Sequence, residues 1–224
     1  MYEKFGQFID GNWSPSTDKG TYEVINPATE EILGHASKAT SVDVDKALKS
    51  AEKGLQIWKK TTPWDRSYIL RRIADKLREK KDVLAKWMTL ENGKPLAEGV
   101  GETNGAADIF EWNAEETKRI FGQTIESRFE DTRVHVYYQP VGVVAALSPW
   151  NFPLILAARK ISTALAAGCS VIIKPDTITP GVVMELVDIC RECGVPPGAV
   201  NLLSGDPPSI ASQLIQSDII KKIS

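Results

Sequence analysis

Apolar side chains recur at helical spacing through much of the first half of the chain. The stripe that follows Ser41 and the one over 65–91 each predict an amphipathic helix, and a more acidic stretch over 95–119 predicts a third. Near the N-terminus, residues 8–13 contain an Asp-Gly pair that predicts a hairpin, with 22–25 as its neighbouring strand. Residues 1–122 are therefore expected to form a hairpin and a layer of helices.

The pattern changes at residue 123. Residues 132–139 alternate polar side chains with β-branched or aromatic ones, as a strand does. Two strands that reach away from a helical layer often form an arm between subunits. We therefore predict that 123–140 is an antiparallel β arm for oligomerisation.

From residue 141 to 224 short apolar runs alternate with helical stretches. The helical stretches begin at Pro153, Pro180 and Pro207, where the missing amide N–H costs nothing. This alternation predicts an α/β fold with a parallel Rossmann-like sheet flanked by helices. Residues that follow the strands then lie at the carboxyl edge of the sheet, where such folds bind ligands.

Composition narrows the classes of function. The chain has 224 residues, 42% of them hydrophobic and 25% charged, with a net charge of −2, so no attraction to nucleic acid or to an anionic membrane is expected. Its start lacks the pattern of a signal peptide, and it contains no apolar run of about 18 residues. A cytoplasmic location is the expectation, and three cysteines do not form a disulfide framework.

Short motifs occur in order along nearly the whole chain. They are Ile25-Asn26-Pro27-Ala28-Thr29, Glu91-Asn92-Gly93-Lys94-Pro95, Pro140-Val141-Gly142-Val143, Pro149-Trp150-Asn151-Phe152-Pro153, Ala166-Ala167-Gly168-Cys169, Lys174-Pro175 and Gly194-Val195-Pro196-Pro197-Gly198. At these spacings they resemble the aldehyde dehydrogenase superfamily, and 88–98 and 114–119 look most like its succinate-semialdehyde dehydrogenases. The resemblance implies oxidation of an aldehyde, here succinate semialdehyde, to the acid by NAD(P), in a dimer or tetramer of identical subunits.

Asn151 is the candidate catalytic residue. In the family, the matching asparagine donates its side-chain N–H to the aldehyde oxygen, on which negative charge develops. Deleting such a donor costs about 2.7–4 kcal/mol in other enzymes. The residues alone leave a second role open, because Asn151 could simply cap the helix that begins at Pro153.

The resemblance places the cofactor contacts after three of the strands. They are Leu147, Ser148, Pro149, Trp150, Asn151, Lys174, Pro175, Asp176, Thr177 and Gly205. Lys174 is expected to reach the hydroxyls or phosphate of the adenosine ribose, although a lysine at a strand end can also be merely solvated. The Asn151 amide and the Lys174 ammonium are expected to project into a shared crevice.

Thr177 bears on the choice between NAD and NADP. Many NAD-preferring relatives have a glutamate at this position, and that carboxylate would repel a 2′-phosphate. Thr177 is neutral, so the cofactor is expected to be NADP or NAD, with NADP favoured. Asp176 leaves the choice open, because its charge could replace the missing glutamate.

Arg159 is the candidate substrate-binding residue. It lies eight residues after Asn151, roughly 12 Å along a helix, close to the length of a four-carbon semialdehyde with its contacts. In succinate-semialdehyde dehydrogenases an arginine here binds the far carboxylate, which a guanidinium can hold by both oxygens. The alternative is that Arg159 and Lys160 form an exposed basic pair.

The cysteines offer no catalytic group. Cys169 is expected to be a buried structural thiol, and the Cys190…Cys193 pair lacks the further ligands that zinc needs, so no metal is expected. None of the three matches the nucleophile of the family, nor does the sequence contain its general-base glutamate. We therefore expect an N-terminal half without a catalytic domain, inactive by itself. The alternative is a non-catalytic fragment that binds nucleotide or pairs with subunits.

Overall fold

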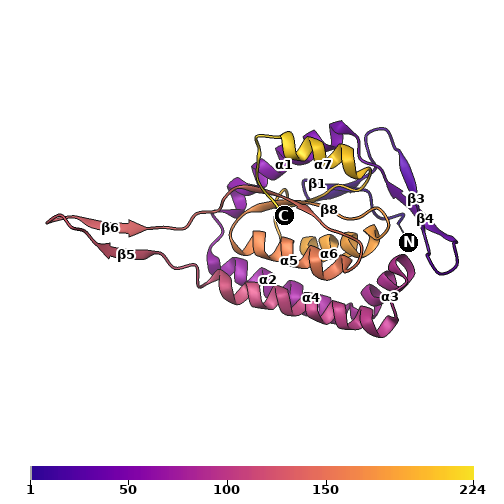
Figure 1. Cartoon of the computed structure of the whole chain (residues 1–224), viewed down its shortest axis with the longest axis horizontal. Helices are drawn as coiled ribbons and strands as arrows, with labels where there is room; N and C mark the ends of the chain where they lie inside the picture. Colours follow the sequence, from indigo (N-terminus) through magenta and orange to yellow (C-terminus); the bar gives the residue numbers. More distant parts are fainter. Residues whose placement is uncertain (1) are drawn as a thin grey trace.

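The computed structural model describes residues 2–224 and has an α/β fold (Figure 1). Its central sheet has six strands in the order β10-β7-β8-β9-β1-β2. The first four of these are parallel, whereas β1 pairs antiparallel with both β9 and β2. The strands are β1 (Gln7–Ile9), β2 (Asn12–Ser14), β7 (Val143–Leu147), β8 (Ser170–Lys174), β9 (Val200–Leu202) and β10 (Ile220–Ile223). The predicted parallel sheet is confirmed.

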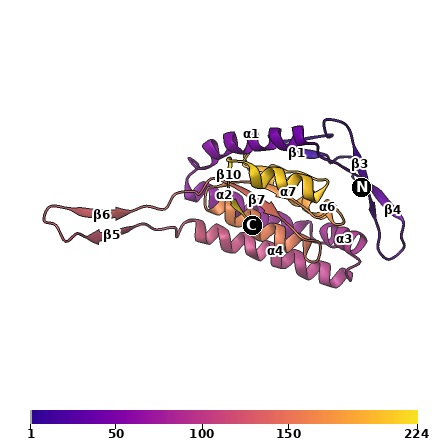
Figure 2. The same ribbon diagram turned by 45° about the horizontal axis from the view of Figure 1, so that its top comes forward.

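Helices cover both faces of this sheet. The helices are α1 (Ser41–Trp58), α2 (Pro63–Glu79), α3 (Lys81–Asn92), α4 (Leu96–Thr117), α5 (Pro153–Ala166), α6 (Pro180–Glu192) and α7 (Pro207–Gln216). Helices α1 and α7 pack on one face, and α5 and α6 pack on the other (Figures 1 and 2). Helices α2, α3 and α4 form a further layer outside α5 and α6. In the described part of the chain, no helix is both long and apolar enough to cross a membrane.

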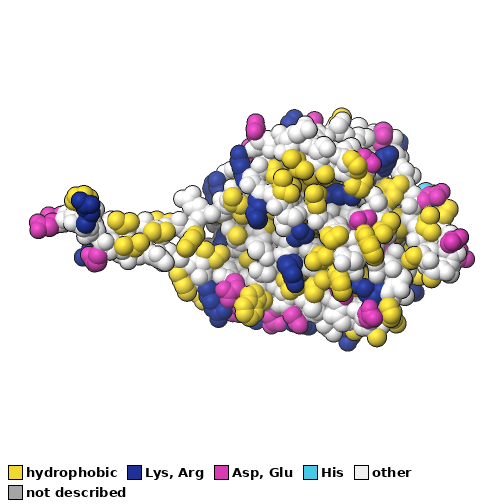
Figure 3. All heavy atoms as spheres, viewed as in Figure 1, with side chains coloured by type: hydrophobic (Ala, Val, Ile, Leu, Met, Phe, Trp, Pro, Cys, Tyr) yellow, Lys and Arg dark blue, Asp and Glu magenta, His cyan; other side chains and the backbone are white. Residues whose placement is uncertain are grey.

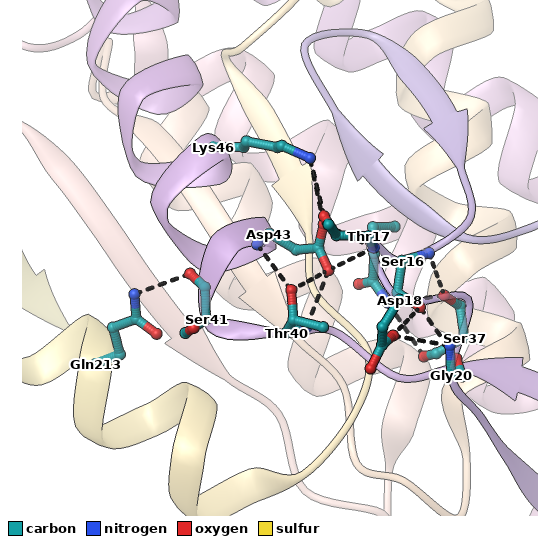
Figure 4. Close-up of polar contacts among 11 residues, drawn as sticks. Ser16, Thr17, Asp18, Gly20, Ser37, Thr40, Ser41, Asp43, Lys46 and Gln213 are labelled. Carbon is teal, nitrogen blue, oxygen red and sulfur yellow. Dashed lines mark hydrogen bonds and ion pairs between the residues drawn. The ribbon is translucent and has the colours of Figure 1, made fainter.

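A capping box defines the start of α1 (Figure 4). The Asp43 amide donates to the Thr40 hydroxyl at 3.3 Å, and the Asp43 carboxylate accepts from the Thr40 amide at 2.9 Å. The same carboxylate accepts from the Thr17 amide, so the helix start is tied to the loop after β2. Burial raises the pKa of Asp43, but the hydrogen bonds from Thr17 and Thr40 together outweigh burial and hold it below its ordinary value.

The predicted hairpin over 8–13 is present, with Asp10 and Gly11 both at positive φ, as a tight hairpin turn requires. Two other expectations are wrong. Strand β3 (Thr21–Ile25) pairs with β4 (Ile32–Ser37) in a separate sheet, because β1 uses its free edge to pair with β9.

The helix expected over 65–91 is two helices, α2 and α3, which meet at Lys80. No glycine or proline interrupts the sequence there, so the apolar spacing continues across the junction and conceals it. Both helices contact α4 and α6.

Strands β5 (Gln123–Glu126) and β6 (Arg133–Val136) form the predicted antiparallel arm, which projects from the body (Figures 1 and 2). Hydrophobic side chains are exposed along the arm and at its base (Figure 3); the large ones include Phe121, Ile125, Phe129, Val134, Tyr137 and Tyr138. That the arm pairs subunits stays a prediction, as does the division of the chain at residues 122 and 140.

Candidate functional site

The carboxyl ends of three adjacent parallel strands form the candidate site. Leu147 at the end of β7 pairs with Lys174 at the end of β8, and the Ser148 amide donates to the Lys174 carbonyl at 3.0 Å. Strand β9 lies on the other side of β8, and Gly205 follows it with a φ of 144°. The structure thus brings these positions, together with Pro175, to one edge of the sheet.

The side chain of Lys174 is the buried cation of this edge. The residue is only 4% exposed, and within residues 2–224 its ammonium has no hydrogen-bond or ion-pair partner. Burial lowers the pKa of Lys174, while the carboxylates of Asp176 and Asp206 oppose this effect. A largely buried lysine whose ammonium keeps its donors available suits a ligand that offers hydroxyl or phosphate oxygens.

The loop between β8 and α6 lies beside this ammonium. Asp176 and Thr177 are half-buried in it, and the Asp176 carboxylate accepts from the Ile178 amide at 3.2 Å. Asp176 thus presents a negative charge close to Lys174, and Thr177 presents a neutral hydroxyl one residue further on.

The turn between β7 and α5 carries Asn151. Pro149, Trp150 and Asn151 are exposed, and the Asn151 side chain makes no hydrogen bond within residues 2–224. The N-terminus of α5 is capped instead by Glu102, whose carboxylate accepts from the amides of Leu154 at 2.9 Å and Ile155 at 3.1 Å. The alternative role of Asn151 as a helix cap is therefore wrong, and its amide is available to a ligand.

The Asn151 turn and the Lys174 side chain lie at the same edge of the central sheet but on opposite faces of it. Strand alternation directs Lys174 to the same face as Ile172, which packs with α1 and α7. The Asn151 turn leads into α5 on the opposite face. A ligand that touches both groups would therefore have to cross the rim of the sheet, and the crevice shared by the two side chains stays a prediction.

Arg159 lies away from this rim. It is exposed on α5, six residues or about 9 Å beyond Pro153. It borders a hollow of about 520 Å³ that is also lined by Lys160 and Lys222. These three basic side chains give the hollow a positive character, and burial together with the nearby Lys222 charge lowers the pKa of Lys160.

The three cysteines are buried and unbonded, as expected for Cys169. Burial raises the pKa of Cys190 and of Cys193, which keeps both as thiols. Within residues 2–224, no group of three or more His, Cys, Asp or Glu side chains is placed to hold a metal ion.

Sequence reasoning did not identify the residues that hold the Asn151 turn, which are Asn92, Lys94 and Glu102. Glu102 is one of several acids in α4, and only the contacts in the fold distinguish it. Asn92 donates to the Trp150 carbonyl at 3.0 Å, and Lys94 donates to the Asn151 carbonyl at 3.3 Å. Asn92 and Lys94 do belong to one of the family-like motifs, which was the available signal.

A parallel sheet with polar groups at its carboxyl edge and helices on both faces is the architecture of nucleotide-binding α/β proteins. The model of the aldehyde dehydrogenase family matches residues 13–224, and the chain belongs to this family.

Similar proteins act on semialdehydes, as their names state. Glutarate-semialdehyde dehydrogenase of Pseudomonas putida is 40% identical over 217 residues, which are 97% of this chain and 45% of that protein. The NADP⁺ succinate-semialdehyde dehydrogenase GabD of Escherichia coli is 39% identical over 216 residues, 96% of this chain and 45% of that protein. The chain thus spans about 45% of the length of these relatives.

Solved structures agree in fold. An NADP-dependent enzyme of E. coli superposes with a TM-score of 0.97 at 37% identity, covering 100% of this chain and 47% of that one. Succinate-semialdehyde dehydrogenase of Burkholderia pseudomallei gives a TM-score of 0.96 at 37% identity, covering 98% and 45%.

Proposed function

We propose that the chain forms the cofactor-binding part of an enzyme that oxidises a dicarboxylic semialdehyde, such as succinate semialdehyde, to the acid with NADP or NAD. The pairing of Leu147 with Lys174 is the observation that carries the proposal, because it sets the Asn151 turn and the buried ammonium on one rim. Membership of the aldehyde dehydrogenase family supports the reaction type. The names of relatives at about 40% identity support the substrate class.

The rim fits a dinucleotide by its donor set. Lys174 would donate to the hydroxyls or 2′-phosphate of the adenosine ribose, since its ammonium is buried and unpartnered within residues 2–224. Thr177 would add a neutral hydroxyl, which tolerates a 2′-phosphate and favours NADP. Gly205 at positive φ lets the backbone after β9 approach closely. The bound nicotinamide supplies the hydride acceptor.

The chain supplies two further groups to the substrate. The exposed Asn151 amide would donate to the aldehyde oxygen, where negative charge develops, and fixed donors of this kind lower the barrier most when they are already oriented. Arg159 would bind the far carboxylate from the positive hollow beside α5.

Cofactor binding by the chain itself tests the first half of this proposal. NADP⁺, NAD⁺ and 2′-AMP are titrated into the wild-type chain and into Lys174→Met in a calorimeter. Loss of a charge-assisted hydrogen bond of about 1.5–3 kcal/mol predicts binding at least about tenfold weaker in the variant. Lys160→Met is the matched control, because it removes a lysine from the hollow beside Arg159 and not from the rim. This variant is expected to keep the wild-type affinity for the cofactor. Equal affinity of wild type and Lys174→Met would contradict the role of the rim.

Enzyme activity tests the proposed reaction and substrate class. The complete polypeptide encoded by the gene is assayed with succinate and glutarate semialdehydes and with a neutral aldehyde of equal length. Reduction of NADP⁺ that favours the semialdehydes supports the proposal. The chain of residues 1–224 by itself is expected to be inactive, and cofactor reduction by this chain alone would overturn that expectation.

A further inference from the structure

The turn that carries Asn151 is held by the junction between α3 and α4. Asn92, at the end of α3, donates to the Trp150 carbonyl at 3.0 Å, and Lys94 donates to the Asn151 carbonyl at 3.3 Å. The Lys94 ammonium also lies 4.4 Å from the centre of the Phe152 ring. Three consecutive residues of the turn are thus contacted by two side chains from one short segment.

Glu102 completes this arrangement from α4. One of its carboxylate oxygens accepts from the amides of Leu154 and Ile155, and the other pairs with the Lys94 ammonium. The side chains of Lys94 and Glu102 are 6% and 2% exposed, so both charges are removed from water. The pair therefore links the carbonyl of Asn151 to the first turn of α5.

A contribution to the stability of the fold does not by itself explain the buried pair of Lys94 and Glu102. Burying two charges costs about as much as their attraction returns, and apolar side chains of similar volume would join the helices at least as well. What the pair adds is orientation, because Lys94 donates to the Asn151 carbonyl and Glu102 accepts from two amides of the first turn of α5. A donor for a developing negative charge must be held within about 0.5 Å of its productive position.

We propose that Lys94 and Glu102 are positioning residues for Asn151. They fix the backbone that follows it, from the Asn151 carbonyl to the first turn of α5, so that its amide points to the reacting oxygen without rearrangement. Asn92 acts in the same way through the Trp150 carbonyl. The inference rests on the proposed function of Asn151 as the donor to the aldehyde oxygen.

The test uses a double variant, Lys94→Met with Glu102→Gln, in the complete polypeptide encoded by the gene. The glutamine oxygen still accepts from the amides of α5, and no charge is left buried without a partner. We expect kcat to fall about tenfold or more, because an Asn151 amide that is not correctly oriented loses much of its stabilisation of the developing negative charge. KM for the cofactor changes less than about twofold. The matched control is Arg71→Met with Glu115→Gln, a half-exposed pair between α2 and α4 that keeps wild-type kcat.

Hydrogen exchange on the chain provides a readout independent of turnover. In the double variant, the amides of 150–155 should exchange faster than in wild type, while those of β7 and β8 keep their protection. Asn92→Ala leaves the buried pair intact and so remains informative if the double variant does not fold. It is expected to lower kcat about two- to fivefold and to raise exchange in the same segment.

Asn151→Ala separates the two proposals. If Asn151→Ala keeps wild-type kcat, the proposed function of Asn151 fails. If it lowers kcat while the double variant and Asn92→Ala both keep wild-type kcat and exchange, the positioning role is overturned. A fall in kcat with unchanged cofactor KM and faster exchange confined to 150–155 supports it.

Discussion

Glu91 should make the stability of the chain fall as pH rises through neutrality. Its carboxylate is fully buried at the start of α6, where it accepts from the amides of Gly181 at 2.7 Å and Val182 at 3.3 Å and from the Tyr2 hydroxyl. Burial raises the pKa of Glu91 from 4.5 to about 7, against the lowering effect of those three hydrogen bonds.

The direction and the size of this change in stability follow from proton linkage. Between pH 4.5 and 7 the unfolded chain has lost the proton of Glu91, while the folded chain retains it. The unfolded state then binds fewer protons, so the free energy of unfolding decreases with pH in this window. The displacement to about 7 corresponds to roughly 3 kcal/mol, since each pKa unit is worth about 1.4 kcal/mol. Most of this loss is complete by about pH 7.5.

Urea unfolding followed by circular dichroism measures this effect on the chain between pH 5 and 7.5. The window lies above the range in which Asp43, Asp188 and Asp206 titrate, because the pKa of each carboxylate is lowered from its ordinary value. Glu91→Gln removes the titrating group and keeps its shape, so its stability should vary by less than about 1 kcal/mol across the window.

Glu115→Gln removes a half-exposed carboxylate from α4 and should keep the wild-type slope. Two results would refute the reasoning. One is a wild-type stability that does not decrease between pH 5 and 7.5, and the other is a Glu91→Gln variant that loses stability as steeply as wild type.

Three further predictions concern single residues. Thr177→Glu should shift the ratio of NADP⁺ to NAD⁺ affinity towards NAD⁺ by about tenfold, as measured by calorimetry, because a carboxylate repels the 2′-phosphate; an unchanged ratio would count against this role. Arg159→Leu should raise KM for succinate semialdehyde far more than for a neutral aldehyde in the complete polypeptide, and equal effects would exclude carboxylate binding. Trp58→Phe should cost roughly 1–3 kcal/mol in urea unfolding, because the indole N–H donates to the buried Leu165 carbonyl at 2.9 Å. The exposed Trp112→Phe should cost almost nothing, and similar costs for both would contradict the buried bond.

The α/β part of the fold could be predicted because its signals are local. Strands β7 and β8 are short apolar runs, and α5, α6 and α7 begin at Pro153, Pro180 and Pro207 as expected. The break at Lys80 could not be predicted, because α2 and α3 share one apolar period across it. The pairing of β3 with β4 was also missed, since strand partners depend on which edge remains free in three dimensions.

The candidate site, too, could be predicted only in part. Lys174 and Gly205 could be placed at one edge because every parallel strand ends there. The partners of the Asn151 turn could not be predicted, since Glu102 lies far from it in sequence and differs from the other acids of α4 only in what it touches. Helix periodicity predicts which face of the helix a residue occupies, but it does not predict which backbone group of another segment that residue contacts.

One segment between α3 and α4 connects the helical layer to both halves of the site. Glu91 caps α6, which follows the cofactor loop, and Lys94 bonds to the turn that precedes α5. Gly93 between them has a φ of 77°, which lets the chain reverse so that its neighbours reach two different loops. Substituting Gly93 therefore strains the backbone at the point where both tethers originate. A change there should weaken the cofactor loop and the Asn151 turn together, whereas a change in Glu91 or Lys94 alone should affect only one of them.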